Sequence, residues 1–139
     1  MTRFVLFAVP LVVLAMALWG WGADLVGLEP DASALDVFGV ARPRPLPAWA
    51  LAGAWLLEAF GLTGLFLLVQ GRSGGWWLDG LLTGAIAWIF RGPLLVLTIS
   101  SLTRLPRQPW WGHALSWLAL YPLCGLMLAA LARRSGLRR

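Results

Sequence analysis

Four apolar stretches, each long enough to cross a bilayer, dominate this chain of 139 residues. A membrane-spanning helix needs about 20 predominantly apolar residues. Only 12% of the residues are charged, whereas a typical soluble domain has about 25%. We therefore expect an all-α integral membrane protein that forms a single membrane domain over residues 1–139. Its spans are expected at residues 4–22, 46–69, 76–102 and 110–131.

The connections between the last three stretches are short, so consecutive helices are expected to be antiparallel neighbours in a four-transmembrane-helix bundle. The N-terminal stretch resembles a signal peptide, because Arg3 precedes an apolar run and Ala15 and Ala17 are spaced as in a cleavage site. The run continues to Gly22, however, which makes it long enough to span. We expect this segment to be retained as the first helix.

The distribution of arginine predicts the orientation of the chain, because basic residues next to membrane spans favour the cytoplasmic side. With a cytoplasmic N-terminus, six flanking arginines fall on that side and four on the other. The six are Arg3, Arg72, Arg133, Arg134, Arg138 and Arg139, and the four are Arg42, Arg44, Arg104 and Arg107. We expect both termini to be cytoplasmic, in a bacterial inner membrane. Basic residues placed at membrane flanks give no reason to expect nucleic-acid binding.

Residues 23–45 form the longest polar segment and are expected to be an outer loop. Asp31 as an N-cap and Gly39 as a stop would bracket a short amphipathic helix, with Leu35 and Phe38 on one side, lying on the membrane surface. The favoured alternative is an ordered loop without a binding role, because acidic surface segments are usually only solvated.

Three polar residues inside the predicted spans fall at one depth. Counted at 1.5 Å per residue from the outer ends of their spans, Glu58 lies about 18 Å deep, and Arg91 and Tyr121 lie about 16 Å deep. An ionised side chain at this depth costs about 2.5–3.5 kcal/mol on insertion scales. A guanidinium can pair with a carboxylate, and a tyrosine hydroxyl can satisfy a remaining lone pair. We expect Glu58 and Arg91 to face each other inside the bundle, with Tyr121 close to one of them.

Two roles are open for this cluster. It can fix the register of the helices without any chemistry, which is the favoured interpretation, or it can bind a proton or ligand. A dry pair sealed by Trp55, Phe60 and Phe90 would favour the structural role, and a water-accessible cavity would favour transport.

Other residues suggest packing or ligand contacts. Gly80 and Gly84 form a GxxxG pattern that predicts close packing with a helix of this chain or of another one. His113 and Trp117 lie on one side of the fourth span, where His113 is a candidate ligand for haem or chlorophyll; a hydrogen-bonded surface histidine is the favoured alternative. Asp79 is expected to complement a helix dipole. Trp88 is a candidate cation–π partner of Arg91, and an aromatic side chain that faces lipid is the favoured alternative.

No catalytic or metal-binding motif appears in the sequence. The single cysteine excludes an intramolecular disulfide and a cysteine-based zinc site, and the single histidine excludes bis-histidine haem ligation within one chain. We therefore expect no enzyme activity and no metal site. The sequence requires no cofactor, and the pigment or haem contact considered at His113 stays open. The leading hypothesis is an accessory or structural subunit that packs against a larger membrane protein. The alternative from another class is a proton-coupled small transporter that works as a homo-oligomer, with Glu58 as the titrating carboxylate.

Overall fold

The computed structural model describes residues 1–25, 47–102 and 108–136, and the regular structure in these ranges is helical. Four segments are long and apolar enough to cross a membrane: Thr2–Ala23, Ala48–Val69, Trp76–Leu102 and Trp110–Arg134. The four predicted helices are thus confirmed, with small shifts at their ends. The short interfacial helix predicted between Asp31 and Gly39 lies outside the described residues.

The helices follow one another along the chain with few interruptions. The elements are α1 (Thr2–Leu25), α3 (Ala48–Val69), α4 (Trp76–Ile89), the π-helical η1 (Phe90–Leu94), α5 (Leu95–Leu102) and α6 (Gln108–Arg134). Pro47 precedes α3, where a missing backbone N–H costs nothing, and Gly75 precedes α4. Since α4, η1 and α5 are contiguous, they form one long helical segment.

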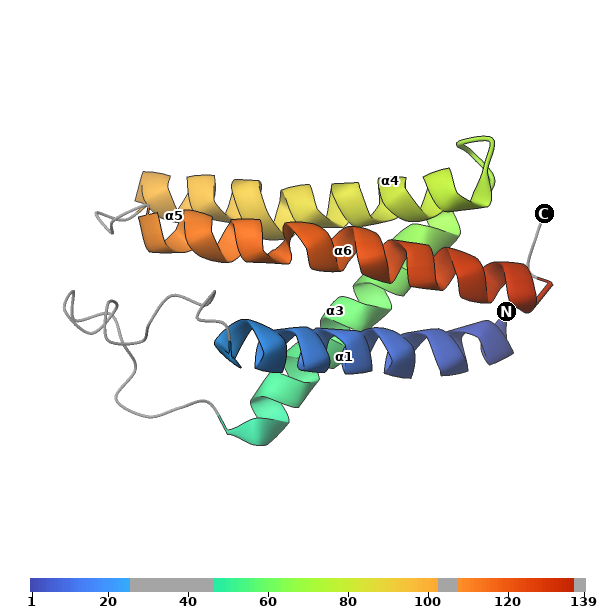
Figure 1. Ribbon diagram of the computed structural model, residues 1–139, viewed down its shortest axis with the longest axis horizontal. Coiled ribbons are helices and arrows are strands. Elements are labelled where there is room, and N and C mark those ends of the chain that lie inside the picture. Colours follow the sequence, from blue (N-terminus) through green and yellow to red (C-terminus); the bar gives the residue numbers. More distant parts are fainter. Residues whose placement is uncertain (26–46, 103–107, 137–139) are drawn as a thin grey trace.

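Successive long helices run in alternating directions, so both ends of the chain lie at the same end of the molecule as the turn between α3 and α4 (Figure 1). Helices α4 and α6 lie side by side along most of their length, whereas α3 crosses the other helices obliquely (Figure 1). The first half of α3 therefore diverges from α5. Because of this divergence, the polar cluster of Glu58, Arg91 and Tyr121 is only partly covered.

The closest contact in the bundle joins α4 to α6 through glycines. A Cβ atom added to Gly80 would lie 2.7 Å from the carbonyl oxygen of Gly125, and one added to Gly84 would collide with the backbone of Tyr121 and Pro122. Small residues at such a crossing let two backbones approach each other. The two glycines of the GxxxG pattern thus contact a helix of the same chain.

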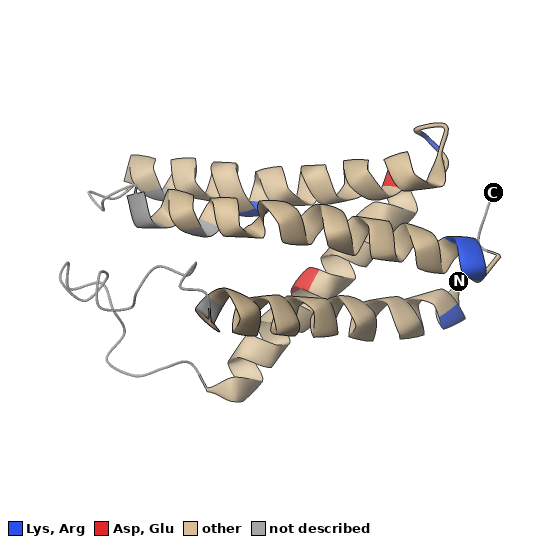
Figure 2. Cartoon of the chain, in the orientation of Figure 1, with Lys and Arg blue, Asp and Glu red and all other residues tan. Residues whose placement is uncertain are grey.

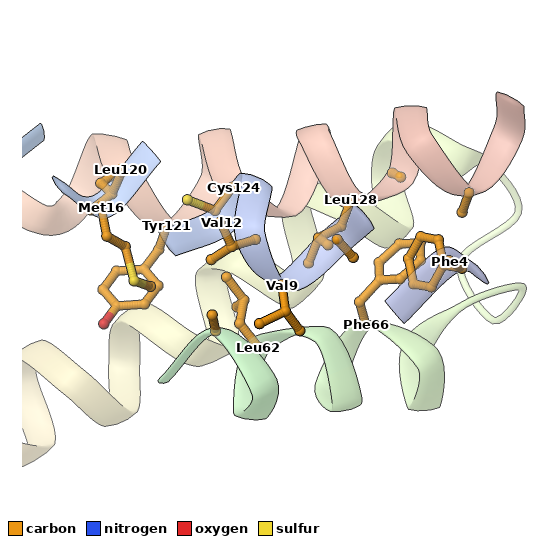
Figure 3. Close-up of a cluster of buried hydrophobic side chains, with 14 of the residues drawn as sticks. Phe4, Val9, Val12, Met16, Leu62, Phe66, Leu120, Tyr121, Cys124 and Leu128 are labelled. Atoms are coloured by element: carbon orange, nitrogen blue, oxygen red, sulfur yellow. The ribbon is translucent and has the colours of Figure 1, made fainter. Parts of the chain in front are cut away.

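A cluster of buried apolar side chains joins α1, α3 and α6 (Figure 3). Helix α1 contributes Phe4, Val12 and Met16 along one face, while Phe66 of α3 and Leu128 of α6 pack against that face. The rings of Phe4 and Phe66 lie 5.9 Å apart. The buried apolar core therefore lies mainly in the half of the bundle that is nearer to the start of α1 and the end of α6.

The outer surface of the bundle is strongly apolar. Large hydrophobic side chains such as Phe7, Leu57, Phe60, Phe90 and Leu115 are more than half exposed. A soluble monomer rarely exposes so much contiguous apolar surface, and the surface is suited to contact with lipid chains.

Asp79 organises the turn between α3 and α4. Its carboxylate accepts hydrogen bonds from the backbone N–H of Gly71 at 2.8 Å and of Ser73 at 3.1 Å, and from the Ser73 hydroxyl. The turn needs Gly71 and Gly74, whose φ angles are both 81°. Asp79 lies in the first turn of α4, where a carboxylate complements the helix dipole as predicted. Its contacts show that it also fixes the path of the preceding turn.

Replacing Asp79 by asparagine is therefore expected to lower the free energy of unfolding by about 1–2 kcal/mol, because one oxygen becomes an amide donor facing backbone donors. Ser73→Ala is expected to cost less, because the backbone N–H of residue 73 still reaches the carboxylate. Denaturant titration in detergent micelles, followed by circular dichroism, measures both changes. Equal stability of the asparagine variant and the native chain would contradict this role.

Candidate functional site

Glu58, Arg91 and Tyr121 meet near the middle of the bundle. The Nε of Arg91 donates to the Oε1 oxygen of Glu58 at 3.1 Å, and the hydroxyl of Tyr121 donates to the same oxygen. Figure 2 shows an acidic and a basic position at mid-length of the helices, whereas the other described charges lie at the end that holds the termini. The contacts expected from the common depth of these three residues are thus present.

The backbone around Arg91 departs from a regular α-helix. Arg91 lies in η1 together with Pro93, which lacks the N–H that a regular helix would use. A single π-helical turn is a common adjustment at such a position. The indole N–H of Trp88 donates to the carbonyl oxygen of Ala114 at 2.8 Å, which ties this region to α6. The end of α4, just before Arg91, is therefore tied to α6.

Trp117 is the aromatic partner of Arg91. The guanidinium carbon of Arg91 lies 5.4 Å from the centroid of a Trp117 ring, within the range of a cation–π contact. Trp117 also packs on Tyr121, with ring centroids 5.8 Å apart. Trp88, the other candidate partner of Arg91, instead directs its indole N–H to the Ala114 carbonyl of α6. The sequence suggested Trp117 as a pigment contact next to His113 and did not indicate its contact with Arg91.

The cluster is not enclosed within the bundle, which corrects part of the expectation. Tyr121 is buried, but the side chain of Glu58 is 18% exposed and that of Arg91 is 42% exposed. Phe60 and Phe90 are 55% and 67% exposed and do not seal the pair. The physical reason is the oblique course of α3 (Figure 1), which brings Glu58 to the arginine without covering the Arg91 side chain.

Two recesses adjoin the ion pair. One, of about 340 Å³, extends from Glu58 and Arg91 along Leu62, Leu65 and Phe90. The other, of about 230 Å³, extends from the same pair along Met16, Trp55 and Trp117. Both are lined mostly by apolar side chains. Glu58 and Arg91 therefore line both recesses.

The pair has hydrogen-bonding capacity left over. A guanidinium has five N–H donors, and among the described residues Arg91 uses only its Nε, on Glu58. The Oε2 oxygen of Glu58 likewise has no hydrogen-bond partner in this part of the chain. These atoms are available to a group from outside the chain.

Replacing Tyr121 by phenylalanine is expected to lower the free energy of unfolding by about 1–2 kcal/mol, because it removes a hydrogen bond to a charged acceptor and leaves the buried ring in place. In a Glu58→Gln background the same change is expected to cost less, since the acceptor is then uncharged. A double-mutant cycle of unfolding midpoints in detergent measures the coupling. Independent, additive losses would show that the hydroxyl and the carboxylate do not interact.

The remaining candidates stand apart from this cluster. His113 lies in α6, but its side chain is outside the described part of the structure, so the haem or chlorophyll contact has no geometry to support it. Cys124 is buried in the core between α1, α3 and α6. Among the described residues, no group of three histidine, cysteine or acidic side chains is placed to hold a metal ion.

Comparison of the chain with family models, with curated proteins and with solved structures found no match.

Proposed function

We propose that this chain is a small integral membrane protein that crosses a bacterial inner membrane four times and serves as an accessory subunit of a larger membrane complex. Both termini would face the cytoplasm. This orientation is supported by the gathering of Arg3, Arg72, Arg133 and Arg134 at the end of the molecule that holds the termini (Figure 2).

The observation that carries the proposal is the exposure of Arg91 at mid-length of the bundle. Glu58 balances its charge, but a guanidinium that is 42% exposed presents further N–H groups to the surroundings. Within a bilayer no water is at hand to accept these hydrogen bonds, and unsatisfied polar groups are costly there. A helix of a partner protein that covers this surface would supply the acceptors.

The chemistry of such a partner follows from the charge of the pair. Since Glu58 already neutralises Arg91, a second carboxylate would bring an unbalanced negative charge into the membrane. An uncharged acceptor, such as a serine, threonine, asparagine or glutamine side chain, would satisfy the guanidinium without that cost. The exposed side chains of Leu57 and Phe90 and the two recesses offer apolar surface around it.

Purification from the native membrane in mild detergent tests the proposal. The native chain is expected to elute with a larger protein, whereas the Glu58→Gln/Arg91→Leu double variant is expected to fold but to elute without it. Phe7→Leu changes an exposed side chain of α1 outside both recesses, keeps the charged pair, and serves as a control that should retain the partner. Recovery of the native chain alone, as one monodisperse species, would contradict an accessory role.

A second function is favoured by one observation: Glu58 and Arg91 line two recesses. In a proton-coupled transporter that works as a homo-oligomer, Glu58 would take up and release a proton between the two recesses. Reconstituted liposomes distinguish the functions: transport predicts a proton flux that Glu58→Gln abolishes, and the accessory role predicts no flux from the purified chain.

A further inference from the structure

A third cavity, which neither Glu58 nor Arg91 lines, combines a cationic side chain with an apolar wall. It has a volume of about 290 Å³ and lies between the α3–α4 turn, the start of α4 and the last turns of α6. We infer that this cavity binds the phosphate headgroup of an anionic lipid at the cytoplasmic surface of the membrane. The inference rests on the proposed membrane insertion but not on the accessory role.

Arg133 is the cationic group of the cavity. Its guanidinium carbon lies 5.5 Å from the centroid of a Trp76 ring, so the aromatic face positions the charge at the rim. Within the described part of the chain, the one ion pair joins Arg91 to Glu58, and Arg133 has no carboxylate partner there. Arg133 is exposed and is therefore free to meet a phosphate.

The acidic residue of the cavity does not compete for this arginine. Asp79 is only 5% exposed, and its oxygens accept hydrogen bonds from Gly71 and Ser73. Its charge is thus directed to the turn, whose backbone forms part of the rim. Asp79 therefore shapes the cavity instead of supplying a counter-ion to Arg133.

The apolar part of the cavity distinguishes a lipid from a free phosphate ion. Phe66, Ala129 and Ala132 form a wall that leads from the polar rim toward the middle of the bundle. A lipid can place its phosphate on Arg133 and the first carbons of its acyl chains on this wall. Arg3, Arg72 and Arg134 lie at the same end of the molecule but do not line the cavity.

Native mass spectrometry of the full chain, titrated with phosphatidylglycerol or phosphatidylcholine, tests the inference. The native chain is expected to retain phosphatidylglycerol in preference to phosphatidylcholine. Arg133→Gln is expected to weaken phosphatidylglycerol binding about fivefold, because it removes the guanidinium that lines the cavity. Arg134→Gln removes the same charge from the neighbouring position outside the cavity and is expected to leave binding within twofold of the native value.

Two further arms complete the test. Trp76→Leu keeps Arg133 but removes the ring that positions it, and is expected to weaken phosphatidylglycerol binding by a smaller factor than Arg133→Gln. Inorganic phosphate at millimolar concentration is expected not to displace the lipid, because it gains nothing from the apolar wall. Equal losses in the Arg133 and Arg134 variants would overturn the site, and displacement by inorganic phosphate would overturn the lipid as its ligand.

Discussion

Replacing Gly84 by leucine is expected to lower the free energy of unfolding by about 3 kcal/mol or more. A Cβ atom at this position would collide with the backbone of Tyr121 and Pro122 in α6, and a backbone cannot rotate aside as a side chain can. The two helices must separate, so the buried contacts of α4 with α6 are lost together. Denaturant titration in detergent, followed by tryptophan fluorescence, measures the change.

Gly64→Leu is the matched control, because no heavy atom lies within 4 Å of a Cβ added at that position on α3. Its effect is expected to stay within about 0.5 kcal/mol. If the two leucine variants were equally stable, the close contact of α4 with α6 would not be the main packing interaction of the bundle.

Replacing Arg91 by leucine is expected to cost about 2–3 kcal/mol, because it leaves the Glu58 carboxylate without its cation. The value is placed below that of a fully buried pair because the Arg91 side chain is 42% exposed. The double variant Glu58→Gln/Arg91→Leu is expected to regain most of the loss, since no uncompensated charge remains. Unfolding midpoints of the native chain, both single variants and the double variant give the coupling energy.

Glu58→Gln alone provides the internal control of this cycle, because it leaves a cation without a carboxylate. We expect it to be less stable than the double variant. A double variant whose loss equals the sum of the two single losses would mean that the two charges do not stabilise each other.

Much of the polar cluster was predictable from the sequence because helical rise converts residue number into depth. Counting residues placed Glu58, Arg91 and Tyr121 at one level, and the contacts of all three follow from that. The GxxxG pattern also identified the glycines at the closest helix crossing. Both inferences depend only on residue spacing within each helix, which a single sequence gives directly.

The surroundings of the cluster were less predictable because depth does not fix the rotation or crossing angle of a helix. The oblique course of α3 leaves Arg91 half exposed, where the sequence suggested an enclosed pair (Figure 1). Trp88 and Trp117 are both near Arg91 in depth, yet only Trp117 is turned toward it. The choice between them depends on how η1 and α6 pack, which involves residues far apart in the sequence.

The contacts of Asp79 were missed for a related reason. Its position in the first turn of α4 was evident, but the fold of the turn before it depends on the positive φ angles of Gly71 and Gly74. A glycine-rich segment permits many turn conformations. The sequence therefore indicated a turn without indicating which backbone N–H groups would reach the carboxylate.

Site-directed photo-cross-linking in native membranes tests most directly whether a partner protein covers the surface around Arg91. Phe90 is 67% exposed beside Arg91, and Phe7 is 68% exposed on α1, so a photoreactive phenylalanine at each position gives a matched comparison. We predict a discrete protein adduct from position 90 that is lost in the Glu58→Gln/Arg91→Leu background, and none from position 7. The absence of a protein adduct at position 90, or equal adducts from both positions, would contradict the proposed accessory role.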